Sequence, residues 1–279
     1  MFRVIAAVCG LLFSFHVIAE KPLQVVTSIQ PLALIAKTVL PSETQYRVLV
    51  PNGGNPHSYA LKVSDRQAIA NADLVLWIGP QMERFLAKVM KQSTAPSIAM
   101  AELDSVTWPE ESHNEEVSHH HGHDHSGQDM HMWLNPNNAL ELVAAIGRVL
   151  EVNAGNGVNT IASLDKSVSE QLHVLKDLNY GVYHDAYSHF TAHYRLSDPI
   201  VVSPGEDSRP GARHLHKIRQ QLKGGDCLFV APGQTNGLSL QVSRAANIPL
   251  VKLDPLQADS YTQLITAMAD AFVECGTGK

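Results

Sequence analysis

After its first 19 residues, this chain lacks both long hydrophobic runs and clusters of basic residues. No later segment approaches the roughly 20 apolar residues that a membrane-spanning helix requires, so we expect the mature chain not to be embedded in a membrane. The 279 residues include 21 Lys and Arg and 27 Asp and Glu, a formal net charge of −6. A mildly acidic chain without basic runs is not expected to bind nucleic acid or an anionic membrane surface.

The first 19 residues predict an export signal. Arg3 supplies a positive charge, and the stretch from Val4 to Val17 is almost unbroken apolar sequence. This stretch is too short and wrongly flanked for a spanning helix, and small or medium residues precede a cleavage point at Ala19. We therefore predict a signal peptide at 1–19, cleaved after about Ala19; a buried N-terminal helix is the alternative.

Cysteine is scarce, with three residues in the whole chain. Cys9 lies inside the predicted signal peptide, which leaves Cys227 and Cys275. In an oxidising compartment an even pair predicts one disulfide, although two free buried thiols would also fit. We do not expect a zinc site at this pair, because neither cysteine has a close Cys or His neighbour in sequence.

Short apolar runs alternate with helical patterns along most of the chain. Strands are predicted at 24–27, 46–50, 74–78 and 97–100, and again at 181–184, 200–203, 227–230 and 249–253. Helices are predicted between these strands, and two more, at about 136–152 and 158–178, lie between the two groups of strands. This alternation predicts two α/β lobes with mostly parallel sheets, joined by a long helix.

The predicted division of the chain follows these patterns. It comprises the signal peptide at 1–19, an N-terminal lobe at 20–136, connecting helices at 137–178 and a C-terminal lobe at 179–279. A ligand site is expected in the cleft between the lobes, because open α/β sheets bind ligands at the carboxyl ends of their strands.

The segment 110–129 within the first lobe has no apolar periodicity. It consists mainly of acids, Ser, Gly and histidines, and is expected to be a mobile loop because it cannot bury enough apolar surface to fold. Several imidazoles on a flexible chain can bind Zn²⁺ without one fixed geometry, but the entropy cost of ordering opposes tight binding. We interpret the segment as an accessory zinc collector or sensor; a solvated linker is the alternative. Its histidines are His113, His119, His120, His121, His123 and His125.

Three further histidines lie in separate loops. His57 follows the strand at 46–50, His184 ends the strand at 181–184, and His131 lies where the chain re-enters the fold. Borderline-soft Zn²⁺ favours nitrogen donors in a tetrahedral array, so three such imidazoles suit a zinc site. Asp254 ends the last predicted strand and could supply the fourth ligand, although an Asp before Pro255 is also a good turn former.

His189 and His193 are spaced i, i+4 and share one face of a predicted helix. A second metal site on this face is possible on spacing alone. We predict instead that the two histidines form a solvated helix face.

Several short motifs occur in order over nearly all of the mature chain. They are Pro56-His57-Ser58-Tyr59, Ser64-Asp65, Ala72-Asp73-Leu74-Val75, Trp77-Ile78-Gly79-Pro80, Met130-His131-Met132-Trp133-Leu134-Asn135-Pro136, Tyr183-His184-Asp185-Ala186-Tyr187, Pro210-Gly211-Ala212-Arg213 and Leu253-Asp254-Pro255-Leu256. Taken together, this set resembles the metal-binding solute-binding proteins of ABC importers, specifically the zinc-uptake, ZnuA-like branch.

The resemblance implies two lobes bridged by a rigid long helix, with Zn(II) bound between them by His57, His131 and His184. It also implies a disulfide between Cys227 and Cys275, which is similar to that of the zinc-specific branch. Some relatives have an acid immediately before the first histidine, whereas this chain has Pro56. The fourth ligand is therefore expected to be water or Asp254.

The function implied by the resemblance is zinc capture in the periplasm, without catalysis, and delivery to the membrane permease of an ABC importer. The protein is expected to be a monomer. A histidine-rich loop is typical of zinc-importing members, so the segment 110–129 strengthens this assignment.

Three other functions remain as alternatives. A manganese or iron importer component would share the fold, but harder metals favour two carboxylates with two histidines. A zinc hydrolase would need a general base beside a metal-bound water; no His-Glu-x-x-His motif is present, and Asp185 and Asp254 are the evident candidates. A periplasmic zinc buffer without a transporter is the third.

Overall fold

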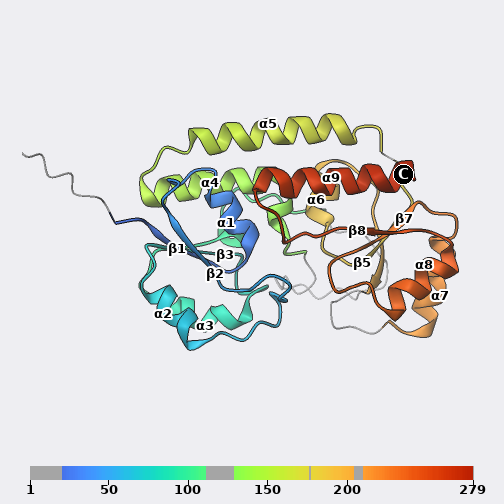
Figure 1. The fold of residues 1–279 in the computed structure, drawn as a ribbon, viewed down its shortest axis with the longest axis horizontal. Coiled ribbons are helices and arrows are strands. Elements are labelled where there is room, and N and C mark those ends of the chain that lie inside the picture. The colour runs from blue at the N-terminus through green and yellow to red at the C-terminus, as the bar shows by residue number, and fades with distance from the viewer. Residues whose placement is uncertain (1–20, 111–128, 176, 204–209, 279) are drawn as a thin grey trace, which may run out of the picture.

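The computed structural model describes residues 21–110, 129–175, 177–203 and 210–278 (Figure 1). The predicted signal peptide at 1–19 lies outside the described residues, as do the histidines of the histidine-rich segment, His113, His119, His120, His121, His123 and His125. None of the helices within the described ranges is both long enough and apolar enough to cross a membrane.

The N-terminal lobe contains a four-stranded parallel sheet in the order β2-β1-β3-β4. Its strands are β1 (Gln24–Thr27), β2 (Gln45–Val48), β3 (Leu74–Trp77) and β4 (Ser97–Ala99). Its helices are α1 (Gln30–Ala36), α2 (Val63–Ala70), α3 (Arg84–Gln92) and the short 3-10 turn η1 (Met100–Glu102). Every residue of β3 is buried, as expected for a central parallel strand that is covered on both faces.

The C-terminal lobe repeats this arrangement, with a parallel sheet in the order β6-β5-β7-β8. Its strands are β5 (Tyr180–His184), β6 (Ile200–Ser203), β7 (Cys227–Val230) and β8 (Leu250–Lys252). Its helices are α6 (Ser188–His193), α7 (Ala212–Gln221), α8 (Gly237–Ala246) and α9 (Tyr261–Thr277). In both sheets the first strand pairs with the second and the third, so the prediction of two similar parallel α/β lobes is confirmed.

The chain passes between the lobes through η2 (Met132–Leu134), α4 (Pro136–Leu150) and α5 (Gly155–Leu172). Pro136 occupies the first turn of α4, and the side chain of Asn135 caps it by accepting from Asn137 N. Figure 1 shows α5 running along the outside of α4 and α9, and both helices pack against it. The buried side chains of α5 follow the predicted spacing of three and four residues.

The helix predicted at 158–178 ends at Leu172 in the structure. Leu175 and Leu178 are buried, which continues the apolar pattern, but Val174 between them is 69% exposed. A turn after Leu172 carries the chain toward β5, so the two later leucines reach the core without helical geometry.

One large hydrophobic core extends through both lobes and the helices between them. Smaller cores fill the opposite face of each sheet, one beneath α2 and α3 and the other beneath α7 and α8. One face of each sheet therefore packs against helices of its own lobe. The other face packs against the large core that both lobes share. This sharing restricts movement of one lobe relative to the other.

Trp133 of η2 is fully buried at the junction of the lobes. Its Nε1 donates to Pro255 O at 2.8 Å, and its carbonyl accepts from the Tyr261 hydroxyl at 2.8 Å. A further bond joins Gln30 Nε2 to Ala258 O at 2.7 Å. These contacts tie the N-terminal lobe to the segment between β8 and α9.

Cys227 of β7 and Cys275 of α9 form a disulfide, as predicted. The bond fastens the C-terminal helix to the sheet of the second lobe and closes a loop with a sequence separation of 48. Both cysteines are buried, which restricts their access to reductants.

Replacing both cysteines, Cys227→Ala with Cys275→Ala, is expected to lower the free energy of unfolding by about 3 kcal/mol, mainly because the unfolded chain gains entropy. Urea unfolding of the two metal-free proteins measures this difference. An unchanged unfolding midpoint and slope would contradict a stabilising role for the disulfide.

Glu83 is a fully buried carboxyl group that directly precedes α3, in the loop after β3. Its Oε2 accepts from the backbone N–H groups of Ile78 and Gly79, each at 2.9 Å. Burial raises the pKa of Glu83 from its ordinary value of 4.5 to about 7, although these hydrogen bonds lower it. The stabilising contribution of this group is therefore complete below about pH 4.5 and is lost as the pH rises through about 7.

The substitution Glu83→Gln should remove this loss, because the amide resembles the protonated acid. The difference in unfolding free energy between pH 5 and pH 8 should shrink by about 3 kcal/mol relative to the unsubstituted protein. Urea unfolding of metal-free protein across this range measures it, with the exposed Glu43→Gln as the control. If the unfolding free energies of Glu83→Gln and the unsubstituted chain change with pH in parallel, the raised pKa of Glu83 is refuted.

Candidate metal centre

His57 lies in the loop between β2 and α2. Its backbone N donates to Asn55 Oδ1 at 2.7 Å, which forms a tight turn around Pro56. The far end of the loop is anchored where the Tyr59 hydroxyl donates to the buried Asp65 at 2.9 Å. The sequence therefore positions His57 through local turn chemistry, and its side chain remains exposed.

His131 and His184 occupy more enclosed positions. His131 directly precedes η2 and is 5% exposed, whereas His184 is the last residue of β5, pairs with Ser203 of β6 and is 9% exposed. Two of the three histidines are thus held by the packed junction and the second sheet.

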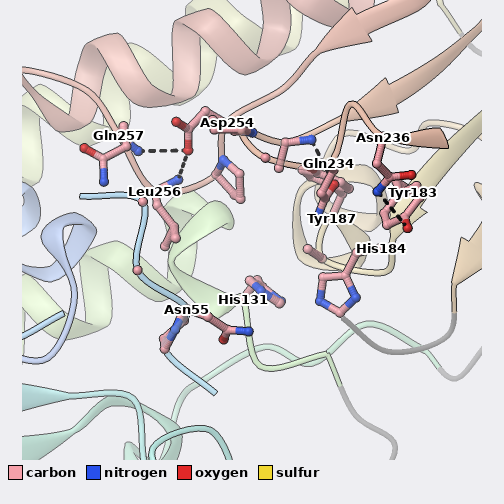
Figure 2. Close-up of a pocket in the computed structure, with 18 residues that line it drawn as sticks. Asn55, His131, Tyr183, His184, Tyr187, Gln234, Asn236, Asp254, Leu256 and Gln257 are labelled. Atoms are coloured by element: carbon pink, nitrogen blue, oxygen red, sulfur yellow. Dashed lines mark hydrogen bonds between the residues drawn. The ribbon is translucent and has the colours of Figure 1, made fainter. Parts of the chain in front are cut away.

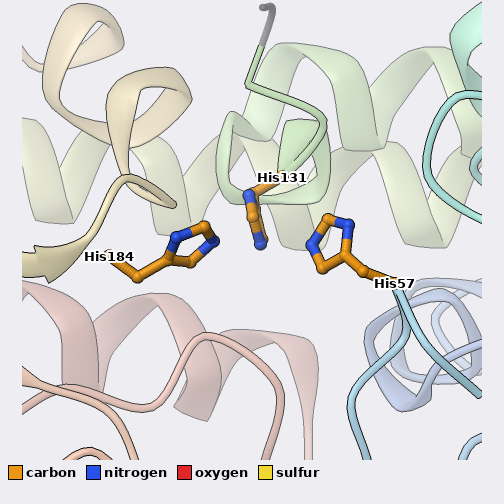
Figure 3. Close-up of side chains that lie close together, drawn as sticks. All are labelled: His57, His131 and His184. Carbon is orange, nitrogen blue, oxygen red and sulfur yellow. The ribbon is translucent and has the colours of Figure 1, made fainter. Parts of the chain in front are cut away.

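The three rings converge, as Figure 3 shows. Ring centroids lie 5.7 Å apart for His57 and His131, 5.6 Å for His131 and His184, and 6.1 Å for His57 and His184. One nitrogen from each ring can be chosen so that all lie within 4.8 Å of one another. Tetrahedral zinc with bonds of about 2.0 Å needs nitrogens roughly 3.3 Å apart, so a small inward movement would complete the site.

Burial keeps the His184 ring uncharged, the form in which an imidazole nitrogen can bind a metal ion. Desolvation, with smaller contributions from His131 and His57, lowers the pKa of His184 from 6.5 to about 3. The ring is therefore uncharged at neutral pH and keeps a lone pair for a metal ion.

Asp129 is a buried carboxylate next to His131 that sequence reasoning missed. Its Oδ1 accepts from His131 Nδ1 at 2.6 Å and from His131 N at 2.9 Å, and its Oδ2 accepts from Ser188 N at 2.9 Å. Burial raises the pKa of Asp129, but the charge and hydrogen bond of His131 outweigh it and lower the pKa to about 2. The predicted mobile loop at 110–129 therefore extends too far, because Asp129 belongs to the packed structure; an acid two residues before His131 was the available signal.

The prediction that His189 and His193 form a solvated helix face is wrong for His189, which is buried, whereas His193 is half-buried. His189 is 1% exposed; its Nε2 lies 2.8 Å from Asp129 O, and its Nδ1 lies 3.3 Å from Asn138 Nδ2. His193 Nε2 lies 2.7 Å from Asp165 Oδ1 of α5. The short helix α6 packs against η2, and both rings make hydrogen bonds to neighbouring elements.

A cavity of about 310 Å³ lies between the lobes and is lined by His131 and His184, by the segment Gly53–Pro56 and by Asp254. Figure 2 shows the Asp254 carboxylate turned toward the backbone of Leu256 and Gln257, whose N–H groups it accepts at 2.9 and 3.2 Å. Burial raises the pKa of Asp254. Asp254 does not join the convergent histidine group, and its role as fourth ligand stays a prediction.

Comparison with known proteins adds to this geometry. Residues 25–275 match the family model described as the periplasmic zinc-uptake complex component A, ZnuA. The chain belongs to this family. The high-affinity zinc uptake system protein ZnuA of Yersinia pestis is 33% identical to it in an alignment 287 positions long, which covers 90% of each chain.

Solved structures share the two-lobed fold. A crystal structure of ZnuA superposes with a TM-score of 0.75 at 19% identity, covering 92% of this chain and 100% of that one. A manganese-bound mutant of a periplasmic metal-binding protein from Candidatus Liberibacter asiaticus superposes with a TM-score of 0.72 at 17% identity, over 92% and 100% of the two chains. Because this fold also occurs with manganese, the choice of metal has to be argued from the ligand atoms.

Proposed function

We propose that this protein captures Zn²⁺ in the periplasm and delivers it to the membrane permease of an ABC importer. The convergence of His57, His131 and His184, with one nitrogen of each within 4.8 Å of the others, carries the proposal. Within the described residues this group contains no carboxylate, and three imidazoles suit zinc better than the harder manganese ion. Water or Asp254 would complete the tetrahedral shell.

Zinc would act here as a bridge between the lobes. His57 comes from a loop of the first lobe and His184 from a strand of the second, while His131 lies at their junction. An ion held by all three binds the folded chain and not the unfolded one, so it stabilises the folded state by about 4 kcal/mol at a free concentration of 1,000 times Kd.

Export and delivery are supported by family membership and by the sequence. A signal peptide at 1–19, cleaved after about Ala19, would bring the monomeric chain to the periplasm. The histidines of the segment 110–129 would collect zinc near the cleft as weaker, accessory ligands. The binding role without catalysis is favoured by family membership, and neither candidate base, Asp185 or Asp254, belongs to the convergent group of histidines.

The site is tested by the substitutions His57→Ala, His131→Ala and His184→Ala, measured by equilibrium dialysis with metal analysis. We expect one tightly bound zinc per unsubstituted chain and a loss of affinity on the order of 100-fold or more for each variant, because loss of an outer-shell partner alone costs about 10- to 100-fold. His216→Ala, on the exposed surface of α7, is the matched control. Tight 1:1 zinc binding that is unchanged in each of the three single variants would contradict the assignment of these histidines as ligands.

Metal choice and transport need separate measurements. In competition dialysis, zinc should displace Mn²⁺ at equal concentrations, and preferential Mn²⁺ retention would overturn the zinc assignment.

A strain lacking the gene should fail to grow under zinc chelation and recover with excess zinc or the unsubstituted gene. Normal growth of that strain would favour a periplasmic buffer, and metal-dependent ester or peptide hydrolysis by the purified protein would favour an enzyme.

A further inference from the structure

The contacts of Asp129 join His131 to α6 of the C-terminal lobe. Its Oδ1 contacts the ring and the backbone N of His131, whereas its Oδ2 accepts from Ser188 N at the start of α6. Ser188 lies four residues after His184 in the chain. The Asp129 carboxylate thus contacts the candidate ligand His131 directly. It also contacts the start of α6, the segment that follows the candidate ligand His184.

We propose that Asp129 is a positioning residue for zinc, which holds His131 with Nε2 toward the cleft and sets its place relative to His184. This inference rests on the proposed function, in which both histidines bind the ion. Asp129 does not itself need to contact zinc.

The orientation of the His131 ring follows from hydrogen-bond chemistry. An ionised carboxylate can only accept, so the 2.6 Å contact requires His131 Nδ1 to carry the proton. Nε2 of the neutral ring then keeps its lone pair for a metal ion, and a charge-assisted bond also makes that nitrogen a stronger donor. An uncapped imidazole could rotate or present either nitrogen.

The position of Asp129 itself is held from the other side. Asn138 Nδ2 of α4 donates to His189 Nδ1, so His189 Nε2 carries the proton and donates to Asp129 O at 2.8 Å. The backbone carbonyl and the side chain of Asp129 are both bound by α6. Because α6 follows directly on the strand end that carries His184, a shift of Asp129 would displace His131 relative to His184.

A second, half-buried aspartate–histidine pair in the same region provides a control. Asp165 of α5 accepts from His193 of α6 at 2.7 Å, so it also links an aspartate to a histidine and anchors α6. Neither residue belongs to the convergent group of histidines. A purely structural role for Asp129 predicts that Asp129→Asn and Asp165→Asn behave alike toward zinc.

The test compares the zinc Kd of the unsubstituted protein, Asp129→Asn and Asp165→Asn by competition with a chelator of known affinity, alongside the thermal unfolding of each metal-free form. We expect Kd to rise about 10- to 100-fold for Asp129→Asn. It should change less than about threefold for Asp165→Asn. Equal affinities for the two variants would overturn the proposal, whatever their stabilities.

A measurement on the unsubstituted protein keeps the proposal testable even where Asp129→Asn does not fold. The ¹⁵N NMR chemical shifts of the His131 ring in the zinc-loaded protein should show zinc bound to Nε2 and a proton on Nδ1. Zinc bound to Nδ1 would overturn the positioning role of Asp129. Failure of the unsubstituted chain to bind zinc 1:1 would count against the proposed function. Normal zinc binding with equal variants would count against the positioning role alone.

Discussion

The buried indole of Trp133 is the contact on which the geometry of this protein depends. It donates to Pro255 O and its own carbonyl accepts from Tyr261, so the chain between the lobes is bonded to the segment that enters α9. Unsatisfied polar groups at this depth would be costly, which makes the two bonds strongly position-determining. Since His131 lies two residues before Trp133, the two hydrogen bonds of Trp133 also fix the position of this candidate ligand.

The shared core determines how much of the site can move. His131 and His184 are buried next to the large core, whereas His57 projects from an exposed loop. Because close-packed interiors resist deformation, the small inward movement that zinc requires falls mainly on the His57 loop. This division suits a protein that must hold its ion and also release it: two ligands are pre-arranged, and the third is on the more adaptable segment.

The sequence predicts much of this architecture because its signals are local. Fully apolar runs such as Leu74–Trp77 predict buried parallel strands. Breaker residues mark the loop that carries His57, and His184 is the last residue of its strand. The convergence of the histidines is implied by the family resemblance, because their spacing alone is equally compatible with ordinary polar residues at strand ends. The cysteine count and the resemblance together predict the disulfide between Cys227 and Cys275.

What the sequence does not predict are the contacts between distant segments. Asp129 looks like the last acid of a polar stretch, and only its contacts with His131 and Ser188 reveal a buried carboxylate. His189 and His193 share one helix face in sequence, but packing of α6 against η2 buries His189, and bonds to Asp129 and Asp165 engage the two rings. Long-range partners of this kind decide burial, and periodicity carries no information about them.

The central claim is that three histidines from separate segments hold one zinc ion between the lobes. A crystal structure of the zinc-loaded protein, with anomalous scattering measured at the zinc edge, tests it most directly. The account predicts one strong peak about 2.0 Å from a nitrogen of each of His57, His131 and His184. A principal peak at the histidines of the segment 110–129, or one that lacks any of the three, would contradict it.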